Sequence, residues 1–304
     1  MLDAHQHFWK IARDDYGWMS PDLGPLYRDF GPEDLWPLMQ AAGITRTILV
    51  QAAETEAETD FLLDIAGRTG FVAGVVGWID MLAPDFAARL DHYVAQPKWL
   101  GLRPMLQEHD PALIADPRFR RALAEVARRG TPFDILTHPR HLAPMVQAVQ
   151  ATPGLHAILD HISKPVMTGP VDGDWAAGIR ALAAVPGLHC KISGLVTEAG
   201  ADWTADRIRP FVDLVAEAFG PDRLVFGSDW PVDPLDQFLA LKVGVTRAGD
   251  PTASALIGDI LTDQTVLKAL RSVNSDIPTG LDSGKSSDAA RRYNFDVTNK
   301  LIII

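Results

Sequence analysis

Eight short apolar segments, flanked by segments of helical character, constrain the fold of this chain more than any other feature. Near-continuous apolar strands of this length are typical of a parallel sheet that is buried on both faces. Their alternation with helices predicts an α/β protein with a (β/α)8 TIM barrel, and a doubly wound open sheet is the alternative. The predicted strands are residues 2–7, 45–51, 71–79, 99–103, 131–137, 156–161, 188–193 and 223–228.

The segments between these strands carry apolar residues at helical spacing. Pro32-Glu33-Asp34 opens one of them with residues that suit the first turn of a helix, and Gly43 follows its end. Gly130 and Gly220 follow two others, as is common after a helix C-terminus. The predicted helices are residues 32–42, 56–68, 85–94, 118–129, 142–150, 175–185 and 207–219.

The C-terminal part of the chain does not continue this alternation. The 304 residues are 47% hydrophobic and 22% charged, a globular composition that suits one large barrel or two smaller domains. From about Lys242 onward the rhythm stops, and residues 272–288 are rich in Ser, Asp, Gly and Lys, which favours loop or disorder. We expect a catalytic barrel over residues 1–241 and an atypical, partly irregular segment over residues 242–304.

Charge and composition exclude several classes of function. The net charge is −11 without a dense basic cluster, which argues against a nucleic-acid partner. Cys190 is the single cysteine, so neither an intramolecular disulfide nor a cysteine-based zinc site can form. No apolar run reaches the roughly 18 residues that would span a bilayer, and the N-terminus lacks a secretory pattern. We expect a cytoplasmic protein, and the sequence leaves its oligomeric state open.

Polar residues stand where the predicted strands end, which is where barrels of this kind carry their functional groups. His5 and His7 are two apart on the first strand, so both project to the same face. Asp229 follows the apolar run 224–226 of the last strand. Two imidazoles and a carboxylate at one barrel mouth suggest a hydrolytic site. The other polar or aromatic residues at strand ends are Gln51, Trp78, Asp80, Arg103, Thr137, His138, His161 and Ser193.

Several motifs of other enzymes are absent from the sequence. No Gly-x-Gly-x-x-Gly follows a strand, and there is neither a Walker loop nor a Gly-x-Ser-x-Gly elbow. These absences disfavour a Rossmann dehydrogenase and an α/β-hydrolase, and no organic cofactor is expected.

Five segments together resemble the metal-dependent hydrolases of the amidohydrolase superfamily, and within it the sugar-lactone and dicarboxylate-lactone hydrolases. They are residues 3–9, 101–104, 159–165, 190–194 and 226–231, and residues 15–18 and 26–30 are most similar to the L-fuconolactonase branch. The resemblance covers about residues 1–235, and the tail departs from the family pattern.

The resemblance implies a role for each residue of the central constellation. Asp229 matches the family's general base, and His161 matches a histidine that would polarise the lactone carbonyl or orient water. The His pair, His5 and His7, would bind a divalent metal such as zinc together with Asp229, or would instead hydrogen-bond the substrate; both possibilities stay open. Arg103 is a candidate for stabilising the developing oxyanion, because a guanidinium suits negative charge.

The resulting hypothesis is a hydrolase that opens an L-fuconolactone-like sugar-acid lactone, its small-molecule partner, by attack of water on the ring carbonyl. The alternatives are a dicarboxylate-lactone hydrolase, a metal-dependent decarboxylase, and an inactive barrel that only binds sugar acids. The candidate substrate-binding residues are His138, Gln51, Trp78, Ser193 and Trp230.

Overall fold

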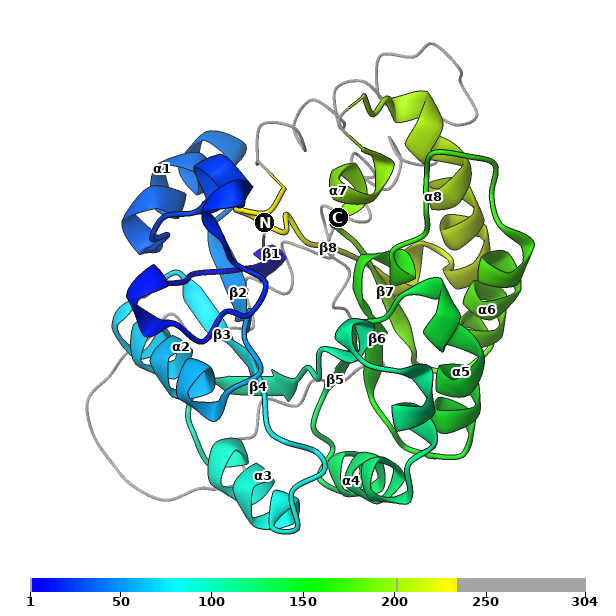
Figure 1. Ribbon diagram of the computed structural model, residues 1–304, viewed down its shortest axis with the longest axis horizontal. Coiled ribbons are helices and arrows are strands. Elements are labelled where there is room, and N and C mark those ends of the chain that lie inside the picture. The colour runs from blue at the N-terminus through cyan, green and yellow to red at the C-terminus, as the bar shows by residue number, and fades with distance from the viewer. Residues whose placement is uncertain (1, 201, 234–304) are drawn as a thin grey trace.

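A computed structural model describes residues 2–200 and 202–233, and it confirms the predicted barrel (Figure 1). Eight parallel strands are hydrogen-bonded in chain order from β1 to β8. Each predicted apolar segment forms a strand, shorter than expected by one to four residues. The strands are β1 Leu2–Gln6, β2 Arg46–Val50, β3 Val72–Gly77, β4 Trp99–Leu102, β5 Phe133–Ile135, β6 Ala157–Leu159, β7 His189–Ile192 and β8 Leu224–Phe226.

The first and last strands meet just beyond their carboxyl ends, which nearly closes the barrel. Gln6 forms a parallel bridge with Trp230. The His7 amide donates to the Trp230 carbonyl at 2.8 Å, and the Asp229 amide donates to the His5 carbonyl at 2.8 Å. This closure joins two segments more than 220 positions apart, so the predicted His pair and the predicted acid become neighbours.

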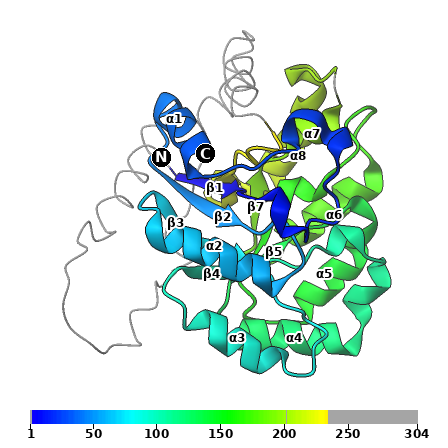
Figure 2. The ribbon, with the colours of Figure 1, turned by 60° about the vertical axis from the view of Figure 1, so that its left-hand side comes forward.

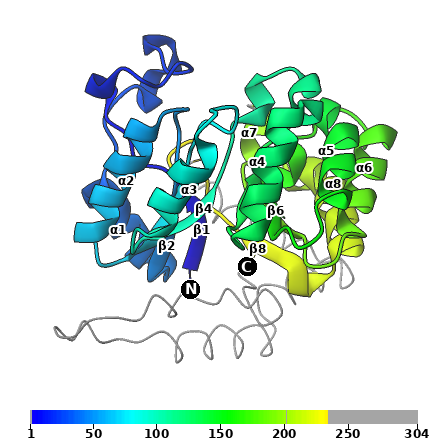
Figure 3. The same cartoon turned by 90° about the horizontal axis from the view of Figure 1, so that it is seen from below.

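Helices surround the strands, as Figures 1, 2 and 3 show from three directions. Capping explains several of their ends: the Thr55 hydroxyl accepts from the Glu58 amide at the start of α2, and Gly43 ends α1 in a left-handed conformation. The α-helices are α1 Pro32–Ala42, α2 Glu56–Arg68, α3 Phe86–Val94, α4 Pro117–Arg128, α5 Leu142–Gln150, α6 Gly173–Ala183, α7 Leu195–Ala199 and α8 Ala205–Phe219. The 3-10 helices are η1 Ile11–Arg13, η2 Pro21–Leu26, η3 Leu106–Glu108, η4 Pro111–Ala115, η5 Pro139–His141, η6 Asp160–Ser163 and η7 Pro221–Arg223.

The apolar core lies mainly between the strands and the helices that cover them. One cluster contains buried side chains from β4 to β7 and from α3 to α8, and a second joins β1, β2 and β3 to α1 and α2. Buried polar side chains from several strands instead converge on the interior of the barrel. Among the described residues no helix is long and apolar enough to cross a membrane. The predicted boundary at residues 241–242 and the atypical tail lie outside the described residues.

Candidate active site

The predicted catalytic residues and the predicted metal ligand His5 come together because each lies in or just after a strand. His5 is within β1, Arg103 follows β4, His161 follows β6, and Asp229 follows β8. In a closed parallel barrel these carboxyl ends face one mouth. All four residues are buried, with at most 5% of their surface exposed.

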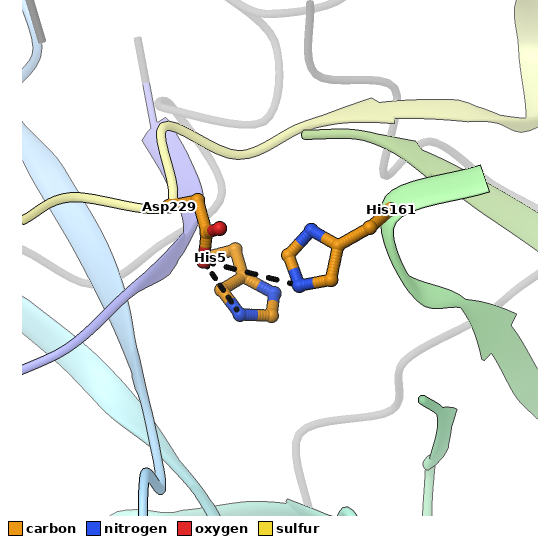
Figure 4. Close-up of side chains that lie close together, drawn as sticks. All are labelled: His5, His161 and Asp229. Carbon is orange, nitrogen blue, oxygen red and sulfur yellow. Dashed lines mark ion pairs between the residues drawn. The ribbon is translucent and has the colours of Figure 1, made fainter. Parts of the chain in front are cut away.

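Asp229 is surrounded by three imidazoles. Its Oδ1 lies 3.1 Å from His7 Nε2, 3.5 Å from His5 Nε2 and 3.8 Å from His161 Nε2. Figure 4 shows His5 and His161 converging on this carboxylate from different strands. Burial alone would raise the pKa of Asp229, but His161, the hydrogen bond from His7 and the nearby His5 together hold it well below its usual range. Asp229 is therefore a carboxylate at neutral pH.

His161 is held between Asp229 and Ser193. The Ser193 hydroxyl lies 2.9 Å from His161 Nδ1, which leaves Nε2 on the side of Asp229. Burial lowers the pKa of His161 to about 4, against the opposing effect of Asp229. His161 is thus a neutral imidazole at neutral pH, and it can donate one proton in a hydrogen bond without carrying charge.

The backbone around these residues has unusual geometry. His161, Ile162, Ser163 and Lys164 all have positive φ angles between 47° and 61°, and Asp229 has a φ of 58°. Positive φ in non-glycine residues costs energy and is concentrated at functional sites. No sequence signal predicted this run, which turns the chain sharply after β6 and directs His161 into the barrel mouth.

A buried charge network, which the sequence interpretation missed, lies next to His5. Lys191 on β7 pairs with Asp134 on β5 and lies 2.9 Å from Asp160 Oδ1. Arg103 Nη1 lies 3.3 Å from Asp160 Oδ2, so two cations and two anions share the interior. The signal that could have found it is a charged residue inside an otherwise apolar strand, as in Phe133-Asp134-Ile135 and Cys190-Lys191-Ile192.

This network sets the state of His5. Lys191 Nζ lies 3.2 Å from His5 Nδ1, and Arg103 Nη1 lies 3.2 Å from His5 Nε2. Burial and then the Lys191 charge lower the pKa of His5 well below its usual range. His5 is therefore neutral at neutral pH, with a cationic donor beside each ring nitrogen.

The side chains of Gln51 and Arg103 each donate a hydrogen bond to the backbone carbonyl of the other residue. Gln51 Nε2 donates to the Arg103 carbonyl at 2.7 Å, and the Arg103 guanidinium donates to the Gln51 carbonyl. Within residues 2–200 and 202–233 the buried Gln51 Oε1 has no hydrogen-bond partner. An unpaired buried acceptor at a strand end is suited to a ligand hydroxyl.

The remaining predicted substrate-binding residues have different surroundings. His138 is half-buried after β5, and burial followed by the Lys164 charge lowers its pKa. Trp78 is half-buried after β3. Its amide donates to the Thr59 hydroxyl, and that hydroxyl donates to the Trp78 carbonyl. Trp230 is 4% exposed and packs edge-on against Phe8 and Phe30 in the apolar core. Their roles toward substrate stay predictions.

Part of this site could hold a metal ion. His5, His161 and Asp229 each offer one ligand atom, and these atoms lie within 4.8 Å of one another. Two imidazole nitrogens and a carboxylate oxygen match the three-ligand pattern of catalytic zinc, so the donor set fits. The predicted set contained His7 in place of His161. The His7 ring nitrogens face Asp229 Oδ1 and, at 2.8 Å, the Val50 carbonyl.

Comparisons with known proteins identify relatives of this chain. The family model described as Amidohydrolase matches residues 2–270. The chain is 43% identical over 235 residues to an L-fucono-1,5-lactonase of Burkholderia ambifaria, covering 77% of this chain and 81% of that protein. An L-fucono-1,5-lactonase of Burkholderia multivorans is 40% identical, over 76% of this chain and 82% of that protein.

Solved structures show the same relationship. An amidohydrolase from Burkholderia multivorans, crystallised with bound zinc, superimposes with a TM-score of 0.74 at 36% identity and covers 86% of this chain and 96% of its own. The same amidohydrolase with bound HEPES also gives a TM-score of 0.74, at 35% identity, over 84% of this chain and 94% of its own. The chain therefore belongs to the amidohydrolase family.

Proposed function

We propose that this protein hydrolyses L-fucono-1,5-lactone, or a closely related sugar-acid lactone, to the open-chain acid. The observation that carries the proposal is a buried carboxylate, Asp229, held among three imidazoles in a chain that is 43% identical to an L-fucono-1,5-lactonase. A small-molecule lactone is the partner. The cytoplasmic location and the absence of a nucleic-acid partner stay predictions.

Asp229 acts as the general base in the proposed reaction. Its carboxylate takes a proton from a water molecule, whose oxygen attacks the carbonyl carbon of the lactone. The bond from that carbon to the ring oxygen then breaks, and protonated Asp229 returns the proton to the departing alkoxide. Water and lactone become one hydroxy acid, and Asp229 is regenerated.

His161 and Arg103 stabilise the charge that develops on the carbonyl oxygen. His161 is neutral, and its Nε2 side faces Asp229, so a carbonyl oxygen bound beside the carboxylate is within reach of an N–H donor. Arg103 adds a fixed positive charge 3.2 Å from His5 Nε2. A divalent ion held by His5, His161 and Asp229 would supply further Lewis-acid polarisation of the same carbonyl.

A covalent intermediate is not part of the proposal. Cys190 is fully buried, and burial raises the pKa of its thiol, so it is not a thiolate nucleophile. The proposed route therefore needs only water as the nucleophile.

The test is a pH-indicator assay of acid release from L-fucono-1,5-lactone by the wild type and by Asp229→Asn. We expect turnover by the wild type and a loss of about two to four orders of magnitude in the variant, because general acid–base catalysis contributes ~10²–10⁴-fold. An Asp229→Asn variant that keeps near-normal turnover would exclude this mechanism. Three other outcomes would favour the alternative functions. Turnover of a dicarboxylate lactone instead would favour the dicarboxylate-lactone hydrolase, and release of carbon dioxide from an aromatic acid would favour the decarboxylase. Lactone binding without turnover would favour the inactive binding barrel.

A further inference from the structure

Asp3 is a buried carboxylate that the proposed mechanism does not use. It lies two residues before His5 on β1 and is 0% exposed. Its Oδ1 accepts from the His5 amide at 3.1 Å and from the Ser228 amide at 2.9 Å. Its Oδ2 accepts from the Ser228 hydroxyl at 2.5 Å. One carboxylate therefore binds both β1 and the segment that follows β8.

Ser228 also restrains the backbone of the residues that follow it. Its Oγ accepts from the Trp230 amide at 3.1 Å, so the hydroxyl is fixed by one donor while it donates to Asp3. Asp229 lies between these two anchored residues. The hydrogen bonds of Asp3 and Ser228 thus enclose the residue whose side chain is the proposed base.

Asp229 needs such restraint because its backbone is strained. A φ of 58° in a non-glycine residue is unfavourable and persists only where surrounding contacts determine it. The Asp229 amide donates to the His5 carbonyl, and the Asp229 carbonyl accepts from the Asp233 amide at 3.0 Å. Gly227 lies so close to β1 that an added Cβ would be 2.4 Å from the His5 Cβ.

We propose that Asp3 and Ser228 are positioning residues. They hold the strained Asp229 backbone so that the Asp229 carboxylate stays next to the His5 and His7 imidazoles. The inference rests on the proposed function, because it assigns a purpose to the geometry around the base. Burying a carboxylate is unfavourable. The three hydrogen bonds that Asp3 accepts, from the His5 amide and from the Ser228 amide and hydroxyl, offset this cost and restrain the backbone next to Asp229.

The expected signature is a loss of turnover without a matching loss of substrate binding. A displacement of about 1 Å in a catalytic group can cost ~100-fold in rate. We expect Asp3→Ala to lower kcat by roughly that factor with KM changed less than about threefold, and Ser228→Ala to lower kcat by about tenfold. Asp3→Asn should recover most of the lost kcat, because its amide oxygen still accepts from the two N–H groups and its NH₂ can donate to Ser228 Oγ.

Two double variants separate positioning from a general effect on folding. Asp3→Ala combined with Ser228→Ala should be no slower than Asp3→Ala alone, since both remove one shared interaction. Asp3→Ala added to Asp229→Asn should not lower the residual rate further. Thr152→Val, which removes a buried hydroxyl bond to the Ala148 carbonyl on α5, is the matched control and should leave kcat unchanged.

Circular dichroism and thermal unfolding establish that each variant is folded before kinetics are compared. A folded Asp3→Ala variant with kcat within about threefold of the wild type would overturn the inference. If Asp3→Ala does not fold, an unchanged kcat in Ser228→Ala overturns it instead. Loss of the proposed function is distinguishable, because the wild type itself would then fail to release acid from the lactone.

Discussion

Gly194 packs so closely against the His161 and Asp229 side chains that there is no room for a Cβ atom. A Cβ added there would lie 2.6 Å from His161 Nδ1 and 3.2 Å from Asp229 Oδ2, and the residue has a φ of 63°. Only glycine meets both conditions without displacing the proposed base and its neighbour.

Replacing Gly194 with alanine should therefore damage both activity and stability. We expect Gly194→Ala to lower kcat by at least tenfold and to destabilise the fold by about 1–3 kcal/mol, from strain and steric conflict together. Lactone turnover and urea unfolding measure the two effects. Gly187→Ala is the matched control for positive φ, because Gly187 has a φ of 76° and open space around it. Equal turnover in the two variants would contradict the prediction.

Lys191 illustrates how a buried charge depends on its partners. Its pKa is lowered by burial but raised more by Asp134 and Asp160, so it stays protonated inside the barrel. Removing one member leaves the opposite charges unpaired.

Lys191→Met should destabilise the fold by about 3–5 kcal/mol, the usual cost of breaking a buried ion pair. Adding Asp134→Asn to the same chain should restore part of this loss, because it removes an anion that has lost its partner. Chemical denaturation of the two variants measures the difference. A double variant less stable than Lys191→Met would argue against the network as described.

At the scale of elements, the segment between β1 and α1 is attached to the start of α2. Tyr16 donates to Glu58 Oε2 at 2.7 Å, the Ala52 amide donates to Glu58 Oε1 at 3.2 Å, and Arg13 Nε lies 3.5 Å from Glu58 Oε2. Trp18 Nε1 donates to the Ala52 carbonyl at 2.8 Å. Glu58 is thus the shared acceptor of two loops at the barrel mouth.

The contribution of Glu58 to the free energy of unfolding should depend on pH. Burial raises the pKa of Glu58 from 4.5 to about 7, so the folded protein binds this proton more tightly than the unfolded chain. Its stabilising effect is complete below about pH 4.5 and is lost as pH rises to about 7, a change of ~3 kcal/mol at about 1.4 kcal/mol per unit. The unfolding free energy of the wild type, relative to Glu58→Gln, should fall over this window. Parallel pH curves for the two proteins would contradict the assignment.

The positions of elements were largely predictable, whereas their local geometry was not. Residues 32–42, 56–68 and 142–150 form helices with the predicted bounds, because apolar spacing and end signals are local properties of the sequence. The short helix α7 and the left-handed run from His161 to Lys164 were not predicted. Both depend on contacts with distant residues, such as the hydrogen bond from the Thr197 amide to Asp233 Oδ1.

At the scale of the whole molecule, metal binding would be linked to folding. His5, His161 and Asp229 come from three strands or strand ends, so their ligand atoms converge only in the folded barrel. A ligand that binds only the folded state stabilises it, by about 2.7 kcal/mol at a hundredfold excess over its Kd.

Zinc should therefore raise the Tm of the wild type in a concentration-dependent way. Asp229→Asn and His161→Ala should reduce that rise, whereas His109→Ala, at an exposed histidine outside the three-residue set, should retain it. Differential scanning fluorimetry with zinc chloride measures the shift, and bound metal can be counted by elemental analysis. An equal rise in all four proteins would show that zinc binds elsewhere.

The sequence by itself determined the barrel, and it predicted that Asp229, His5, His161 and Arg103 lie in or next to strands at one mouth of that barrel. These follow from local periodicity, from motifs, and from the rule that parallel strands in a barrel share one functional end. Only the tertiary structure decided which atoms meet. Three such contacts are the convergence of His5, His161 and Asp229, the buried pairing of Lys191 with Asp134 and Asp160, and the anchoring of Ser228 by Asp3. They join residues 31 to 225 positions apart. Such contacts depend on strand register and closure of the barrel, which are properties of the packed chain and not of any segment of it.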